Sequence, residues 1–241
     1  DIAKEILGNK IQFPSSFSDE NFTLRQLMNQ ELPWNTWGSF GINIALGNTL
    51  DKEIIADNYM YLPDYVHKAF QNATITKNKI TTPLVLEESQ LLRYPEKQIK
   101  IQWYNPFFVF SLLLLLTIVV TFRDQKINIR SKWLDFTLFF VTGVLGIIIC
   151  FLWFFTDHYT APNNFNLLWA FVLNFFVAFT LLKNSIPSWI SNYLLFYLFL
   201  LFGAIVTSFI GFQQFSNTVF PIIAMLFLRT FYIYRLLTSK K

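Results

Sequence analysis

The sequence predicts a membrane α-helical bundle of five spans, preceded by part of a small α+β domain. Three observations predict this class. The chain of 241 residues is 54% hydrophobic and only 14% charged, whereas soluble domains carry about 25% charged residues. Most charged side chains precede residue 101. Long apolar runs follow, and a membrane-spanning helix needs about 20 such residues. We therefore expect two domains, with residues 1–104 outside the membrane and residues 105–241 within it.

Short helices and strands are mixed in the predicted soluble region. Apolar side chains four residues apart predict a helix over residues 2–8, with a glycine at its end. Thr23 and Gln26 have the spacing of a capping box, which predicts that a helix follows. Pro63 fits the first turn of another helix. Alternating apolar residues predict a strand over residues 99–103.

Two segments and one histidine of this region carry further sequence signals. Residues 34–41 combine aromatic side chains with glycines and are interpreted as a turn. Residues 42–47 fit either a short helix or a strand, and the apolar pattern alone leaves both open. His67 falls in the helix after Pro63. We expect it to be an exposed or capping histidine rather than a catalytic one, because no acid or nucleophile flanks it at an activating helical spacing.

Five apolar segments are predicted to cross the membrane. Trp and Tyr residues stand near their ends, as expected of side chains that prefer the membrane interface. Gly143 and Gly146 are expected to mark close helix packing. Arg229 lies about six residues inside the last span, roughly 9 Å deep, and is expected to snorkel toward the nearer surface. The predicted spans are residues 106–122, 133–155, 167–182, 189–212 and 218–234.

Lys and Arg residues predict how these spans are oriented. They cluster in the loop after the first span, recur at Lys183 and return at the C-terminus. Residues 156–166 and 213–217 contain none. Short loops rich in Lys and Arg stay in the cytoplasm. We therefore expect a cytoplasmic C-terminus, with the soluble region and the turn at residues 156–166 on the outer side of the membrane.

The turn between the second and third spans contains the candidate site. Asp157 and His158 are an ionisable pair, and Asn164 and Asn166 add hydrogen-bonding amides at the same level. Such groups are costly within hydrocarbon, so we place the turn at the membrane surface. Two interpretations stay open. The residues form either a hydrogen-bonded loop that caps the third helix, or a polar site that faces a lipid headgroup or ester linkage.

Several kinds of chemistry find no support in the sequence. No metal-ligand spacing, phosphate-binding glycine loop or serine nucleophile motif occurs, and no basic face is interleaved with aromatic residues. We therefore expect no metal, no cofactor and no nucleic-acid partner. Cys150 is the only cysteine, so the chain forms no internal disulfide. Because it lies in an apolar run, we interpret it as a packing residue rather than a nucleophile.

Two groups of motifs connect the chain to a known family. The soluble region contains W-x-x-F-G-I-x-x-x-L-G, then an aspartate and M-Y-L-P-D-Y, and the membrane region contains F-L-W-F-x-T-D-H, then N-x-N-L-L-W. Together they resemble the Lnb-type lipoprotein N-acyltransferase family, and the resemblance covers essentially the whole chain. The motif residues are Trp37, Phe40–Ile42, Leu46, Gly47, Asp51, Met60–Tyr65, Phe151–Phe154, Thr156–His158, Asn164 and Asn166–Trp169.

This resemblance implies a multi-pass protein of the bacterial inner membrane whose periplasmic domain has a cysteine-peptidase-like fold. It also implies acyl transfer from a membrane phospholipid to the N-terminal amine of a lipoprotein, through a thioester on cysteine. In the family that cysteine precedes a helix like residues 1–8. We therefore expect it upstream of Asp1, and we expect this chain to be an inactive C-terminal fragment in which no catalytic residue is assigned.

Two other functions stay open at this stage. One is a membrane-anchored hydrolase that uses the same cysteine fold on peptides or amides. The other is a non-enzymatic membrane scaffold. A transporter is less supported, because few charges line the predicted helices. The sequence does not indicate an oligomeric state.

Overall fold

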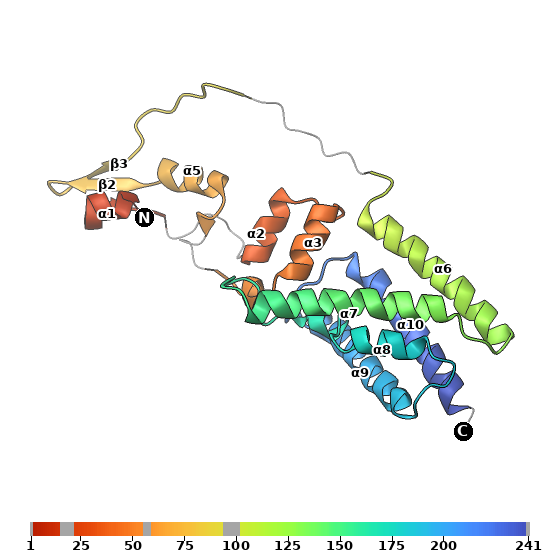
Figure 1. The fold of residues 1–241 in the computed structure, drawn as a ribbon. Helices are drawn as coiled ribbons and strands as arrows, with labels where there is room; N and C mark the ends of the chain where they lie inside the picture. Colours follow the sequence, from red (N-terminus) through yellow and green to blue (C-terminus); the bar gives the residue numbers. More distant parts are fainter. Residues whose placement is uncertain (1, 15–21, 55–58, 94–101, 240–241) are drawn as a thin grey trace. The chain divides into compact units, whose positions relative to one another are not determined.

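The computed structural model describes residues 2–14, 22–54, 59–93 and 102–239 (Figure 1). Contacts divide the chain into two compact units: unit 1 comprises residues 1–31 and 52–99, and unit 2 comprises residues 32–51 and 100–241. The polypeptide therefore passes between the units three times. The predicted boundary at residue 104 follows composition, whereas these units follow three-dimensional contacts, which group residues 32–51 with the apolar helices.

Unit 1 is a small structure of helices and strands. Strands β1 (Ile11–Gln12), β2 (Thr74–Lys77) and β3 (Ile80–Pro83) pair antiparallel in that order. Asn78 and Lys79 join β2 to β3 with φ angles of 51° and 65°, as in a tight two-residue hairpin turn. The helices are α1 (Ile2–Leu7), the 3-10 turn η1 (Gly8–Lys10), α2 (Leu24–Glu31) and α5 (Pro63–Gln71).

The local signals for two of these helices are confirmed. At the start of α2, the backbone N–H of Thr23 donates to Gln26 Oε1 over 2.8 Å, and that of Gln26 donates to Thr23 Oγ1 over 3.2 Å. Pro63 opens α5 as predicted. The strand predicted over residues 99–103 is not observed in the described residues. Its first three residues lie outside the described part of the chain, and Trp103 lies in a turn rather than a strand.

The turn predicted over residues 34–41 is wrong, because helix α3 (Trp37–Ala45) covers most of it. The same helix shows that residues 42–45 are helical rather than a strand. Thr36 Oγ1 accepts a hydrogen bond from the backbone N–H of Ser39 over 3.2 Å, which caps the helix N-terminus. The two glycines that suggested a turn lie on its exposed side. A short 3-10 turn, η2 (Asn48–Asp51), follows the helix.

Unit 2 contains the membrane helices. Within the described residues, four helices are long and apolar enough to cross a membrane. They correspond to the first, second, fourth and fifth predicted spans. We call the end of this bundle that carries residues 155–164 and 210–218 the loop end, and the opposite end the charged end. The four helices are α6 (Pro106–Lys126), α7 (Lys132–Phe154), α9 (Trp189–Phe209) and α10 (Val219–Thr238).

The third predicted span is not one continuous helix. Residues 167–182 contain the end of η3 (Phe165–Leu168), a non-helical stretch, and α8 (Asn174–Leu181). The eight residues of α8 rise only about 12 Å, which is less than half the hydrocarbon thickness of a bilayer.

Two glycines of α7 make room for this broken segment. A Cβ atom at Gly146 would overlap the carbonyl oxygen of Ala170, and one at Gly143 would overlap the backbone of Phe175. The close packing predicted at both glycines is therefore confirmed. The segment touches α7 backbone to backbone, and Trp169 and Ala170 are fully buried, so this part of the break lies against protein, where irregular backbone is tolerated in a membrane protein.

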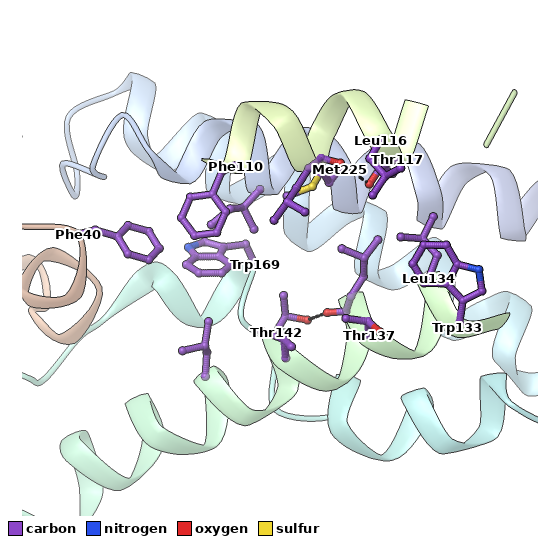
Figure 2. A pocket seen from close by; sticks show the side chains of 15 residues that line it. Phe40, Phe110, Leu116, Thr117, Trp133, Leu134, Thr137, Thr142, Trp169 and Met225 are labelled. Atoms are coloured by element: carbon purple, nitrogen blue, oxygen red, sulfur yellow. Dashed lines mark hydrogen bonds between the residues drawn. The ribbon is translucent and has the colours of Figure 1, made fainter. Parts of the chain in front are cut away.

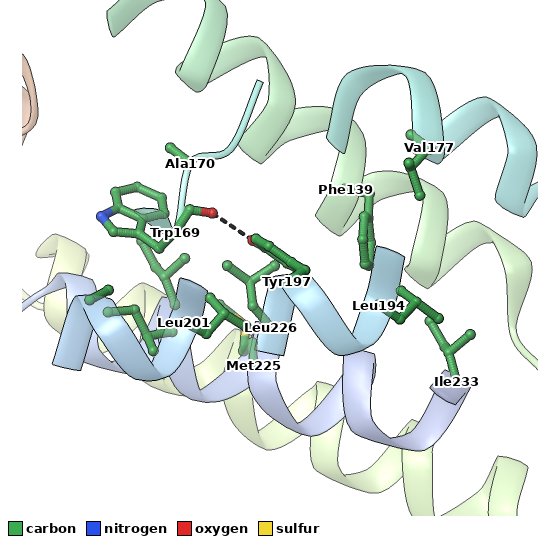
Figure 3. Close-up of a cluster of buried hydrophobic side chains, with 14 of the residues drawn as sticks. Phe139, Trp169, Ala170, Val177, Leu194, Tyr197, Leu201, Met225, Leu226 and Ile233 are labelled. Carbon is green, nitrogen blue, oxygen red and sulfur yellow. Dashed lines mark hydrogen bonds between the residues drawn. The ribbon is translucent and has the colours of Figure 1, made fainter. Parts of the chain in front are cut away.

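Side chains of neighbouring helices complete the hydrogen bonds of the broken segment. The Tyr197 hydroxyl donates to the carbonyl oxygen of Trp169 over 2.5 Å. Asn174 donates to Thr142 Oγ1 over 3.1 Å and accepts from the Tyr193 hydroxyl over 2.6 Å. Figure 3 shows Trp169 and Tyr197 amid the apolar side chains of the main core. Two polar groups at the break, the carbonyl oxygen of Trp169 and the side-chain amide of Asn174, therefore have partners on α7 and α9.

Arg229, at the charged end, does not snorkel toward the surface as predicted. Its side chain is fully buried, and it donates to Asp135 Oδ1 over 2.5 Å and to Asp124 Oδ2 over 2.6 Å. Arg130 donates to Asp135 Oδ2 and to the carbonyl oxygen of Leu181, each over 2.7 Å. Arg229 stays inside because two carboxylates compensate its charge, as buried charges require. The network joins α6, α7 and α10.

Candidate functional site

Asn164 and Asn166 lie together at the loop end and hold the C-terminus of α3. Both are buried. Asn164 Nδ2 donates to the carbonyl oxygen of Ile44 over 2.7 Å. Asn166 Nδ2 donates to Asn164 Oδ1 over 2.9 Å and to the carbonyl oxygens of Asn43 and Ile44, each over 3.3 Å. These carbonyls belong to the last turn of a helix, where no intrahelical donor remains. The two amides therefore act as an external cap, which we call the asparagine clamp.

Backbone contacts extend the asparagine clamp. The N–H of Gly47 donates to the carbonyl oxygen of Thr160 over 2.8 Å, and the N–H of Asn48 donates to that of Asn163 over 3.1 Å. A Cβ atom at residue 47 would overlap the carbonyl oxygen of Pro162. The position therefore requires glycine for this close approach. Two backbone hydrogen bonds therefore join the segment after α3 to the turn.

Gln213 is a further member of the clamp that the sequence did not single out. It is fully buried although it lies in the loop between α9 and α10. Its Oε1 accepts from the backbone N–H of Phe165 over 2.7 Å, and its Nε2 donates to Asn164 Oδ1 over 3.3 Å and to the carbonyl oxygen of Leu46 over 3.4 Å. The only sequence signal for this role was that Gln213 is a polar residue in an uncharged loop between two spans.

Asp157 and His158 occupy a different environment from the asparagines. Both are exposed. His158 Nδ1 is 2.8 Å from Thr156 Oγ1, and that hydroxyl donates to the carbonyl oxygen of Leu152 over 2.5 Å. The imidazole is thus oriented by the last turn of α7 and leaves its other nitrogen to the surroundings. The four predicted site residues therefore separate into a buried pair that holds backbone and an exposed pair that carries the ionisable groups.

The other histidine lies in unit 1 and serves a local contact. His67 is exposed as predicted, and its Nε2 is 2.9 Å from Glu88 Oε1. Gln71 donates to Glu88 Oε2 over 2.5 Å. The hydrogen bond from Gln71, and then that from His67, lowers the pKa of the Glu88 carboxyl, because both favour its charged form. These contacts attach the segment after β3 to α5.

Taken together, the apolar helices, the broken segment and the exposed Asp-His turn define a membrane protein with a polar surface feature at one end of its bundle. Residues 97–241 match the family model described as the Lnb transmembrane domain. Since the match covers more than half of the chain, the chain belongs to the Lnb family. No match was found among curated proteins or among solved structures.

Proposed function

We propose that this protein is part of a lipoprotein N-acyltransferase of a bacterial inner membrane. The observation that carries the proposal is the match of residues 97–241 to the Lnb transmembrane domain. In this proposal unit 1 belongs to a periplasmic domain with a cysteine-peptidase-like fold. The donor is a membrane phospholipid, and the acceptor is a lipoprotein.

The proposed reaction has two steps on a cysteine that precedes Asp1 in the full-length protein. In the first step its thiolate attacks the carbonyl carbon of a phospholipid ester, so that a C–S bond forms and the ester C–O bond breaks. The lysophospholipid oxygen leaves with the proton released by the thiol. In the second step the lipoprotein amine attacks the thioester. A C–N bond forms, the C–S bond breaks, and the amine returns a proton to the thiolate.

We propose five membrane crossings, with residues 167–182 as the third. The support is the break between η3 and α8, where Trp169 and Ala170 are fully buried, since broken helices occur in membrane proteins where neighbouring protein surrounds them. The loop end is proposed to face the periplasm, because Lys and Arg concentrate at the charged end. Asp157 and His158 would then stand at the outer surface, beside lipid ester groups. The asparagine clamp is proposed to hold α3 in place rather than to react.

The test uses the full-length protein reconstituted with a phospholipid that carries an isotope-labelled acyl chain and with a lipoprotein whose N-terminal amine is free. Mass spectrometry is expected to find the label as an amide on that amine. The proposal fails if no label is transferred while a known lipoprotein N-acyltransferase transfers it under the same conditions. His158→Ala is expected to slow transfer without altering the circular dichroism spectrum, because its side chain is exposed.

A further inference from the structure

A cavity of about 360 Å³ lies among α6, α7 and α10 in unit 2. Figure 2 shows Phe40 and Trp169 at one end of it and Trp133 with Leu134 toward the other. Its size falls in the range of small-molecule sites. None of its lining residues is among those assigned above to the candidate site.

The cavity exposes no polar surface, although threonines line it. Thr117 donates its hydroxyl to the carbonyl oxygen of Leu113 over 2.8 Å, and Thr142 donates to that of Leu138 over 2.7 Å. These hydroxyls are therefore occupied by their own helices. The surface that the cavity exposes is apolar, and apolar cavities take up apolar ligands rather than water.

The cavity joins the outer surface of the helices to the interior. Its lining includes side chains of α6 and α7 that are largely exposed, among them Leu116 at 46% and Val141 at 50%. It also includes Ile222 and Met225 of α10, which are 6% and 3% exposed. In a membrane the exposed surface of these helices faces hydrocarbon. The cavity is therefore continuous with the lipid, and a lipid chain is the apolar molecule that can enter it.

The length of the cavity also fits one chain. Its lining on α7 extends from Trp133 to Leu145, a rise of roughly 18 Å at 1.5 Å per residue. The hydrocarbon of one leaflet is about 15 Å thick, half of the whole core. An extended acyl chain of one leaflet thus matches the distance that α7 offers. A headgroup would find no polar partner inside, so it must stay outside the cavity.

Helix α3 closes the cavity toward the loop end. Phe40 of α3 lies with its ring centroid 4.9 Å from that of Phe110, and Trp37 lies 5.8 Å from the same ring. Trp37 Nε1 also donates to the carbonyl oxygen of Tyr104 over 2.9 Å. The asparagine clamp fixes the other end of α3. Phe40 is therefore held in place from both ends of its helix.

From these observations we infer that the cavity binds one acyl chain of a membrane lipid. The chain enters sideways from the bilayer between α6 and α7. The identification of this chain as the one transferred rests on the proposed function. The binding of a lipid chain does not.

The experiment uses the full-length protein in lipid nanodiscs of phosphatidylethanolamine that carries a photoreactive diazirine on one acyl chain. After illumination, mass spectrometry locates the labelled residues. Met225 is the diagnostic position, because it lines the cavity but is only 3% exposed. Leu112 is 50% exposed and does not line the cavity, so it reports ordinary surrounding lipid. We expect label at both positions.

Matched variants test whether label at Met225 passes through the cavity. Val141→Trp places a large side chain in the cavity, and Ile148→Trp is its control, since Ile148 lies two turns further along α7 and is similarly exposed at 48%. We expect the first variant to lower Met225 labelling about tenfold, equivalent to a loss of about 1.4 kcal/mol in binding. The control should leave it unchanged. If Val141→Trp does not fold, Leu113→Trp and its neighbour Leu112→Trp form a second pair.

The outcomes separate the two proposals. Label at Leu112 but not at Met225, or Met225 labelling that is equal in both members of a pair, overturns the cavity as a lipid site. Acyl transfer without Met225 label refutes lipid binding in the cavity, while the proposed function stands. Met225 label that the cavity variants abolish, with no acyl transfer by the unmodified protein, supports the lipid site and refutes the proposed function.

Discussion

Replacing Arg229 with methionine removes the central cation of the charged end while preserving a long, flexible side chain. Arg229 makes close charged contacts with Asp124 and Asp135, and all three side chains are fully buried. After the substitution, Arg130 still pairs with Asp135, whereas Asp124 loses its ion-pair partner. Removing one partner from a buried ion pair costs about 3–5 kcal/mol, because the remaining charge is left uncompensated. We expect Arg229→Met to lower the free energy of unfolding by that amount.

The measurement is equilibrium unfolding in mixed micelles, followed by circular dichroism at increasing denaturing detergent. Arg235→Met is the control, because Arg235 lies on the same helix but is exposed. It should change the free energy of unfolding by less than about 0.5 kcal/mol. A double-mutant cycle with Asp124→Asn should show the two changes to be non-additive by about 0.5–3 kcal/mol. Equal stabilities for Arg229→Met and Arg235→Met would refute the assignment of Arg229 as a buried, paired cation.

Two further predictions concern helix packing and a surface carboxylate. Gly146→Ala should destabilise the protein, because its methyl group would overlap the backbone of Ala170. The control Gly203→Ala in α9 meets no atom within 4 Å and should be neutral or stabilising by about 0.5–1 kcal/mol. Thermal unfolding in detergent compares the two variants, and equal effects would contradict the close approach at Gly146. Glu88 should titrate below its ordinary pKa of 4.5, as measured by carboxyl ¹³C NMR. Because folding favours its charged form, the local stabilisation is present above the ordinary pKa and is lost as pH falls through the lowered one. Gln71→Ala should raise the pKa toward 4.5, and a Glu88 pKa above 4.5 in the unmodified protein would refute the contact.

Local sequence signals predicted those elements whose causes are local. The capping box at Thr23 and Gln26 acts over three residues, and the long apolar runs of α6, α7, α9 and α10 are sufficient to specify helices. Gly143 and Gly146 were also correctly interpreted as a place of close packing. In α3, the hydroxyl cap at Thr36 outweighed the glycines that had suggested a turn.

The features that the sequence did not reveal depend on partners far along the chain. Asn164 donates to Ile44, 120 residues away, so its role in holding α3 could not be inferred from spacing. Nothing local marks the break before α8, because the stretch is uniformly apolar and its interruption depends on the glycines of α7 and the hydroxyl of Tyr197. Arg229 was expected to snorkel because its carboxylates lie more than 90 residues earlier.

The placement of residues 32–51 in the helical unit has a practical consequence for dissecting the protein. Removal of residues 1–104, up to the boundary suggested by composition, would discard α3 together with Phe40. The membrane helices would then lose one wall of the cavity. The amides of Asn164 and Asn166 would lose the carbonyl oxygens to which they donate. Expression of the helices alone should therefore retain residues 32–51, joined to residue 100 by a linker that replaces the intervening half of unit 1.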